Sequence, residues 1–203
     1  MSTRLRERLR TARQRAQRAR AERAAPPTIE LNPQFTRALD SMEKGSAHLF
    51  VTGRAGTGKS TLLEYFRART SKNVAVLAPT GVAAVNVRGQ TIHSFFNFRP
   101  DVTPDAARRL SLKPDRRKLY GKLDAILIDE SSMLRADLLD CVDAFLRLHG
   151  RVKGAPFGGT QMLFIGDLYQ LPPVVAGRGE RQLFSAVYET PYFFSARAFR
   201  TAD

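Results

Sequence analysis

Short runs of apolar residues alternate with longer segments of helical period along most of this chain. Four runs show no regular alternation of apolar and polar residues, which is typical of parallel strands buried between helices; they cover residues 48–52, 74–78, 123–128 and 162–165. Helices are predicted between them, including residues 59 to about 69 and residues 136–148. Strands that alternate with helices predict an α/β fold with a mostly parallel, doubly wound central sheet covered by helices in three layers.

The helix predicted at residues 136–148 is amphipathic. Three apolar residues share one of its faces and three aspartates lie opposite, namely Leu138, Val142 and Phe145 against Asp137, Asp140 and Asp143. The single cysteine, Cys141, falls on the apolar side and has no partner for an intramolecular disulfide. A packed thiol without chemistry is therefore predicted.

Two segments depart from the α/β pattern. Residues 99–121 are polar and basic, with three prolines, and are interpreted as a surface insertion outside the core. Pro26 and Pro27 break any helix that precedes them and mark a domain edge. We therefore divide the chain into an arginine-rich arm at residues 1–27 and an α/β domain at residues 28–203.

The charge of the chain favours a polyanionic partner. Lysine and arginine number 33 against 19 acidic residues, a formal net charge of +14, so nucleic acid is expected and an anionic membrane surface is the alternative. Nine arginines against two glutamates give the arm half of that charge. The arm is predicted to become helical on binding DNA, or else to be only a solubilising tail.

The sequence carries neither a membrane-spanning nor a secretory signal. No run of about 18 apolar residues could span a bilayer, and the N-terminus lacks the apolar stretch of a secretory signal. A soluble, cytoplasmic protein is expected, associated with the nucleoid if the source is bacterial.

Residues 53–60 read G-R-A-G-T-G-K-S, directly after a predicted strand and directly before a predicted helix. This is the context in which such a glycine-rich loop cradles phosphates on its backbone N–H groups at a helix N-terminus. Lys59 is expected to reach the β- and γ-phosphates of ATP, and the Ser60 hydroxyl to ligate Mg²⁺. The predicted nucleotide-binding residues are Gly53, Ala55, Gly56, Thr57, Gly58, Lys59, Ser60 and Thr61. A glycine-rich turn that matches by chance is the alternative.

The predicted strand at residues 123–128 ends in two carboxylates, Asp129 and Glu130. Asp129 is placed to hold Mg²⁺, because hard oxygen ligands suit that ion. Glu130 is the candidate general base that orients and deprotonates the attacking water. An acidic pair alone could also cap a helix. It indicates a catalytic role only together with the phosphate loop upstream.

Four stretches together resemble a known family: GRAGTGKST at 53–61, APTGVAAVNVRGQTIHSFF at 78–96, LIDESSM at 127–133 and FGGTQMLFIGDLYQLPPV at 157–174. In order and spacing they are similar to the PIF and RecD-like branch of superfamily-one DNA helicases, and PYFFSARAF at 191–199 extends the resemblance. The resemblance implies a RecA-like P-loop ATPase domain from residue 28 onward. The arm lies outside it.

The resemblance also implies roles for residues that the local pattern does not identify. Gln170 is implied to sense the γ-phosphate, with Gly166 and Asp167 shaping its turn. Gln34 is implied to contact adenine, although Pro33 stands where the family more often has an acidic residue. Gln34 could equally be a surface helix residue.

The stretch at 78–96 is similar to the family's first DNA-contacting motif. Thr80 and the amides after Gly81 would bind strand phosphates, and His93, Phe95 or Phe96 would stack on bases. At least one of the two adjacent phenylalanines is expected in the core, and His93 could be a structural histidine.

The function implied is that of an ATP-dependent DNA helicase motor domain, in which ATP hydrolysis drives travel along single-stranded DNA, 5′ to 3′, in repair, recombination or telomere maintenance. Its partners would be single-stranded DNA or junctions with duplex, and a monomeric motor would need a second RecA-like lobe and an arginine finger, in cis or from a partner. Neither is found in the 203 residues, so weak hydrolysis is expected. A binding module that uses ATP as a switch ligand, or a phosphotransferase, are the alternatives.

Overall fold

The structure is a computed structural model that describes residues 32–200. The arm predicted at residues 1–27 lies outside these residues, and its predictions stay open. The strands that the structure describes form one all-parallel sheet. Its order is β1 (Leu49–Thr52), β5 (Gln161–Gly166), β4 (Ala125–Ile128), β2 (Val74–Ala78) and β3 (Gln90–Thr91). The predicted α/β class and parallel sheet are confirmed.

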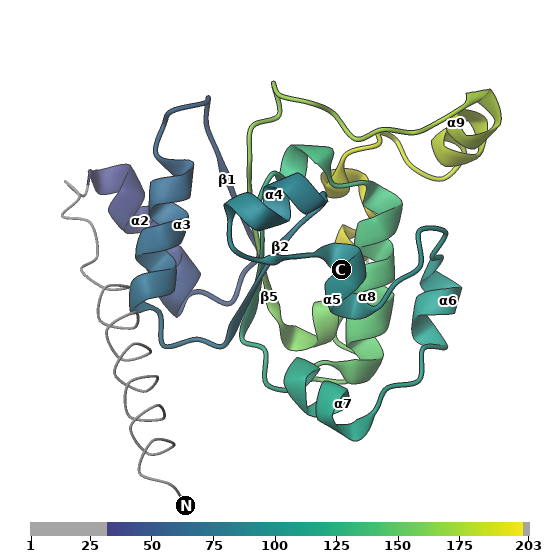
Figure 1. The fold of residues 1–203 in the computed structure, drawn as a ribbon, viewed down its shortest axis with the longest axis horizontal. Coiled ribbons are helices and arrows are strands. Elements are labelled where there is room, and N and C mark those ends of the chain that lie inside the picture. The colour runs from purple at the N-terminus through teal and green to yellow at the C-terminus, as the bar shows by residue number, and fades with distance from the viewer. Residues whose placement is uncertain (1–31, 201–203) are drawn as a thin grey trace, which may run out of the picture.

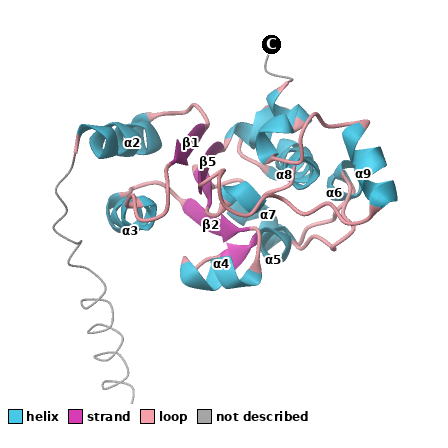
Figure 2. Cartoon of the chain, turned by 90° about the horizontal axis from the view of Figure 1, so that it is seen from above, coloured by secondary structure: helices cyan, strands magenta, loops and turns pink. Residues whose placement is uncertain are grey.

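Helices cover both faces of the sheet (Figures 1 and 2). One face carries α2 (Pro33–Lys44) and α3 (Lys59–Arg69), and the other carries α8 (Ala136–His149). The remaining helices are α4 (Gly81–Asn86), α5 (Ile92–Phe96), α6 (Pro104–Arg108), α7 (Pro114–Tyr120) and α9 (Arg178–Ser185), with 3-10 turns η1 (Ser131–Met133), η2 (Pro156–Gly159), η3 (Phe193–Ser195) and η4 (Arg197–Phe199). Within the described part of the chain, no helix is long and apolar enough to cross a membrane.

The central strand β4 is buried along its whole length and divides its side chains between two cores. Ala125 and Leu127 pack with α3, and Ile126 and Ile128 pack with α8. Both faces of a parallel sheet are covered, so continuous apolar runs rather than alternation mark its strands. The sheet is thus held rigidly between helices, which fixes the positions of the loops at its carboxyl edge.

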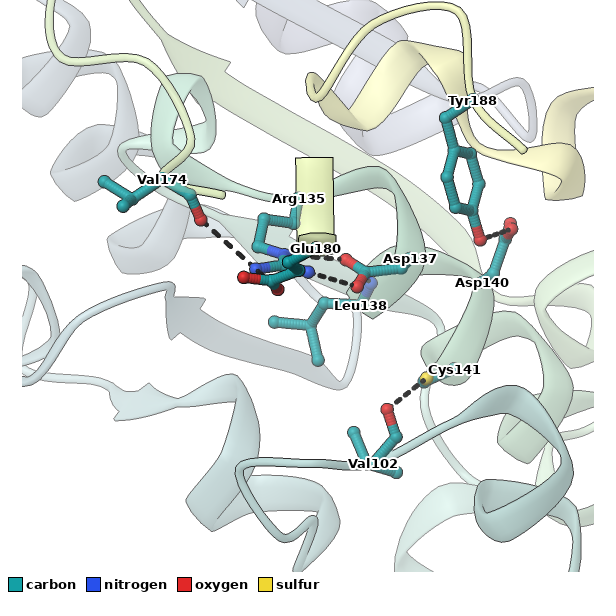
Figure 3. A network of polar contacts seen from close by, with 9 residues as sticks. All are labelled: Val102, Arg135, Asp137, Leu138, Asp140, Cys141, Val174, Glu180 and Tyr188. Carbon is teal, nitrogen blue, oxygen red and sulfur yellow. Dashed lines mark hydrogen bonds and ion pairs between the residues drawn. The ribbon is translucent and has the colours of Figure 1, made fainter. Parts of the chain in front are cut away.

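The amphipathic interpretation of α8 is wrong on its aspartate side. Asp140 and Asp143 are buried, at 7% and 8% exposure. Asp140 accepts hydrogen bonds from the Tyr188 hydroxyl at 2.8 Å, shown in Figure 3, and from the Ala198 backbone N–H at 2.9 Å. Asp143 accepts from the Phe157 backbone N–H at 2.7 Å. The turn before β5 and the chain after β5 cover this face of α8 and supply the donors that a buried carboxylate needs.

The prediction for Cys141 is confirmed, because its side chain is fully buried in α8. Burial raises the pKa of its thiol to about 12. A thiol held protonated in the core is a poor nucleophile. Cys141 therefore has a packing role.

The interpretation of residues 99–121 as lying outside the core is also wrong. Ala107 of α6 and Tyr120 of α7 are fully buried. The Tyr120 ring stacks on Phe96 with 5.8 Å between centroids, and its hydroxyl donates to the Phe95 carbonyl at 2.7 Å. Two short helices thus close the core over α5 and α8, while their charged side chains remain outside.

Candidate nucleotide-binding site

Three loops meet at the carboxyl edge of the sheet. They follow β1, β4 and β5, and β5 lies between the other two strands. In parallel strands all carboxyl ends point to the same edge, where ligands of open α/β sheets bind. In Figure 1 the loops after β1 and β5 rise side by side at the top of the sheet. The topology therefore brings residues 53–60, 129–130 and 166–170 together.

The loop at residues 53–58 has the backbone of a phosphate cradle. Gly56 and Gly58 have φ values of 79° and 89°, in the left-handed region that favours glycine. No heavy atom lies within 4 Å of a Cβ built at either position, so the loop opens onto free space. Helix α3 begins immediately afterwards, at Lys59. An open loop of main-chain amides at a helix N-terminus fits the phosphates of a nucleotide.

Lys59 lies across this loop. Its Nζ donates to the backbone carbonyls of Gly53 at 2.5 Å and Arg54 at 3.0 Å, which holds the ammonium at the cradle. Ser60 follows it in the first turn of α3 and is exposed, and Thr61 is half-buried. An ammonium and an exposed hydroxyl in these positions suit a polyphosphate with a bound cation.

The two carboxylates after β4 are separated by the backbone. The N–H of Asp129 continues the sheet by donating to the Leu77 carbonyl at 2.9 Å. Glu130 then turns sharply, with a φ of 51° that is uncommon for a residue other than glycine. The chain thus leaves the direction of β4 at Glu130 and enters η1 (Ser131–Met133).

Both carboxyl groups lie in surroundings that disfavour their charge. Burial raises the pKa of Asp129, against the lowering by the Glu130 backbone N–H and by Lys59. Burial also raises the pKa of Glu130, and the nearby charge of Asp129 raises it further. A divalent cation at this edge would remove that electrostatic cost, so the residues fit Mg²⁺. The described residues contain no group of three His, Cys, Asp or Glu side chains that could hold a metal. Such a Mg²⁺ would therefore depend on Asp129, Ser60, phosphate and water.

The loop after β5 contributes a third carboxylate that the sequence interpretation assigned only to the shape of a turn. Asp167 is buried at 4% exposure and accepts from the Tyr169 backbone N–H at 3.1 Å and from the Gln170 side-chain amide at 3.3 Å. Its charge is also among the causes that raise the pKa of Glu130. Gln170 itself is exposed, and its hydrogen bond to Asp167 holds its amide beside that carboxylate. A carboxylate directly after a buried strand, as at Asp129, was the signal available.

Gly166 allows this loop to approach the acidic pair closely. A Cβ at this position would lie 2.7 Å from the Ser131 hydroxyl and 3.1 Å from the backbone nitrogens of Ser131 and Ser132. Any side chain would push β5 away from η1. Glycine at position 166 therefore allows the close approach of β5 to η1.

The predicted DNA-contacting residues are only partly in position to bind. Thr80 and the exposed Gly81 lie at the carboxyl end of β2, where the Thr80 hydroxyl accepts from the Ala83 N–H at 3.3 Å and caps α4. His93 is half-buried, and burial lowers its pKa while Asp137 opposes the shift. The predicted stacking of Phe95 on a base is wrong, because its ring is 6% exposed and packs edge-on against Phe96 and Tyr120. A ring enclosed in the core cannot stack on a base.

Gln34 lies exposed in the first turn of α2. The helix is anchored by Phe35, whose ring contacts Tyr65 of α3 edge-on at 6.1 Å between centroids. Gln34 is thus carried by a helix packed against the one that follows the phosphate loop. Its predicted adenine contact stays a prediction.

Arg135, which the sequence interpretation missed, ties the loop after Gln170 to the start of α8 (Figure 3). Its guanidinium donates to both carboxylate oxygens of Asp137 at 3.0 and 2.7 Å, to the Val174 carbonyl at 3.2 Å and to Glu180 at 2.8 Å. Partners some 40 residues away leave no local pattern, so no sequence signal could have found this cluster.

Replacing Arg135 with glutamine is expected to lower the free energy of unfolding by about 1–3 kcal/mol, because several charge-assisted hydrogen bonds are lost from a half-buried position. Urea denaturation measures the change. The control is Lys44→Gln, which removes an exposed ion pair with Asp40 and should leave the free energy of unfolding near that of the parent. Equal effects of the two substitutions would contradict this role.

The acidic pair should make stability depend on pH and on magnesium. The pKa of Asp129 is higher in the folded than in the unfolded chain, so its contribution to stability falls as the pH rises between those two values. Asp129→Asn is therefore expected to unfold at a higher temperature than the parent at pH ~7 without Mg²⁺, with the difference vanishing toward pH ~4. Thermal denaturation across this pH range checks it, and a variant less stable at every pH would disprove it.

Comparisons with known proteins agree with this geometry. The family described as PIF1-like helicase matches residues 30–196. The ATP-dependent DNA helicase Pif1 of Bdellovibrio bacteriovorus is 36% identical over 174 residues, covering 81% of this chain and 38% of its own length. The ATP-dependent DNA helicase PIF1 of Saccharomyces cerevisiae is 42% identical over 144 residues, covering 68% of this chain and 17% of its own.

Among solved structures, the Bacteroides Pif1 helicase in complex with ADP-AlF3 and single-stranded DNA superposes with a TM-score of 0.77 at 37% identity. The match covers 84% of this chain and 40% of that one. The chain thus spans less than half the length of these relatives.

Proposed function

The chain belongs to the PIF1-like helicase family, and we propose from this that residues 28–203 act as the first, ATP-binding lobe of a DNA helicase motor. The observation that carries the proposal is the meeting of the phosphate loop, the acidic pair and the Gln170 loop at one edge of the sheet. A nucleotide-binding protein without coupled hydrolysis would need only the first of these loops.

In the proposed reaction, water attacks the γ-phosphorus of ATP and ADP leaves. Lys59 and the amides of residues 53–60 hold the phosphates, and Ser60 and Asp129 would hold Mg²⁺, which neutralises charge on the phosphate oxygens. Glu130 accepts the proton of the attacking water, as a carboxylate that lies near the γ-phosphate without binding the metal can do. The position of Glu130 beside Asp129 supports this division of roles.

Coupling to movement is assigned to Gln170. Its amide is held by Asp167, whose carboxylate also raises the pKa of Glu130, so a contact between Gln170 and the γ-phosphate would be felt at the catalytic base. The same loop continues to Val174, where Arg135 binds it. A change at the phosphate thus has a continuous physical route to α8.

DNA is the proposed partner, as single strands or as junctions with duplex. Thr80 and Gly81 follow β2 and His93 follows β3, at the same edge as the nucleotide loops. A second lobe, in cis or in trans, would complete a monomeric motor that travels 5′ to 3′, as the family resemblance implies. Cytoplasmic localisation stays a prediction from the sequence.

The test is nucleotide hydrolysis by the protein with and without single-stranded DNA. We expect the 203-residue protein alone to bind ATP, to hydrolyse it slowly and to separate no strands, and DNA to stimulate turnover once a second lobe is supplied. Turnover that DNA never stimulates would contradict the motor and favour a switch ligand. Robust strand separation by the 203 residues alone would contradict the need for a second lobe.

A further inference from the structure

A dense cluster of positive charge lies away from the nucleotide loops. We name as the basic surface the exposed lysines and arginines of α7, its flanking residues and the turn after α8: Lys113, Arg116, Arg117, Lys118, Lys122, Arg151 and Lys153. Residues 108–122 alone carry seven lysines and arginines against one acidic residue, Asp115. This imbalance exceeds that of the described chain around it and needs an explanation.

The two segments of the basic surface lie side by side. Helix α7 immediately precedes β4, and the turn after α8 precedes the neighbouring strand β5, so both lie toward the amino edge of the sheet. An ion pair of 2.6 Å between Arg151 and Asp124 ties them together. Burial, then the charges of Arg117 and Lys153, lower the pKa of His149, which lies between the segments. The charges therefore form one surface rather than two.

Few of these charges are neutralised within the protein. Among the described residues, the ion pairs that involve this region are Arg108 with Asp105 and Arg151 with Asp124. Lys113, Arg117, Lys118, Lys122 and Lys153 have no carboxylate within ion-pair distance in that part of the chain. Adjacent like charges repel, and a polyanion would relieve the repulsion.

The scaffold beneath the charges is rigid. Helix α7 is fixed by the fully buried Tyr120 and by a 3.3 Å hydrogen bond from Arg116 to the Phe95 carbonyl. The side chains of residues 113–119 are all exposed. Because the helix itself is already held in place, binding phosphates would need to order only its exposed side chains.

The basic surface is separate from the DNA contacts proposed at the carboxyl edge. In Figure 1, α7 lies at the bottom of the sheet, while the loops after β1 and β5 lie at the top. DNA that reaches both edges must continue around the side of the lobe. The basic surface therefore lies at the opposite edge of the sheet from those residues.

We propose that the basic surface binds the phosphate backbone of DNA outside the strand held at the nucleotide edge. The proposal rests on the proposed function, since DNA is the polyanion that such a motor engages. Lysines and arginines that read only phosphates give binding without sequence preference and with a strong dependence on salt. The surface would keep the protein on DNA while the nucleotide edge releases the strand.

The test compares two triple variants of the full chain. Arg117→Gln, Lys118→Gln and Lys122→Gln remove three charges from the basic surface. Arg37→Gln, Lys44→Gln and Arg69→Gln remove the same charge from exposed positions on α2 and α3. Fluorescence anisotropy with labelled single-stranded and duplex oligonucleotides is measured across a range of salt concentrations, and titration with a fluorescent ATP analogue checks that each variant is folded.

We expect the basic-surface variant to bind DNA about tenfold or more weakly, and its slope of log affinity against log salt to fall by roughly 2–3 units, while the control stays near the parent. Equal losses of DNA affinity in both variants would show that only the net charge of the protein matters, and would overturn the proposal. If the basic-surface variant bound DNA with the affinity and salt slope of the parent, the proposal would also be overturned. This would hold even if the surface bound anionic phospholipid vesicles. A parent chain that binds ATP but no DNA would also overturn the proposal, whereas the proposed function is tested separately, by DNA stimulation of ATP turnover once a second lobe is supplied.

Discussion

Glu130→Gln is expected to leave ATP binding intact and to slow hydrolysis by about 10²–10⁴-fold, because the amide cannot accept the proton of the attacking water. The substitution keeps the size of the side chain and its left-handed backbone position. It also removes a carboxylate whose charge the site disfavours, so the free energy of unfolding should not fall. Single-turnover hydrolysis of radiolabelled ATP, with protein in excess, measures even a slow parent rate.

The control for this substitution is Glu64→Gln, which changes an exposed glutamate on α3 without touching the acidic pair. It should hydrolyse ATP at the parent rate. If Glu130→Gln did so too, the assignment of the general base would be wrong. If Glu130→Gln lost nucleotide binding instead, Glu130 would be a ligand of the metal rather than the base that deprotonates the attacking water.

Lys59→Ala is expected to weaken nucleotide binding by roughly 10- to 100-fold, because the cation that faces the β- and γ-phosphates is lost. In the structure this ammonium bonds only to the Gly53 and Arg54 carbonyls among the described residues, so its removal opens no core cavity. The loss should be larger for ATP than for a nucleoside lacking phosphates. Titration with a fluorescent ATP analogue measures it.

Lys44→Ala is the matched control, since Lys44 is an exposed lysine on α2. It removes the same charge at a distance from the loop and should bind nucleotide as the parent does. Parent-like affinity in Lys59→Ala would show that the phosphates do not lie at the loop at residues 53–58.

The sequence predicted those parts of the site that depend on local backbone chemistry. Gly56 and Gly58 adopt left-handed conformations, which the glycine-rich sequence of the loop allows, and the helix begins at Lys59 as predicted. Asp129 and Glu130 end a strand at the expected edge. Each of these features requires only neighbours in the chain, so a motif carries them fully.

The parts that could not be predicted depend on residues far apart in the chain. Asp140 is buried because Tyr188 and Ala198 supply donors from 48 and 58 residues away. Arg135 binds Glu180 across 45 residues. The core position of Phe95 depends on Tyr120. Tyr120 belongs to residues 99–121, whose many charged residues led to their interpretation as a surface insertion. Tertiary partners of this kind override a helical period or a count of charges.

The proposed hydrolysis and coupling both require that a magnesium nucleotide binds at the loop formed by residues 53–60. This binding is measured by titrating the purified, folded 203-residue protein with a fluorescent ATP analogue, with Mg²⁺ and with a chelator. We expect a saturable signal at one nucleotide per chain, weakened by the chelator and competed by unlabelled ATP. A folded protein that gives no saturable signal would contradict it.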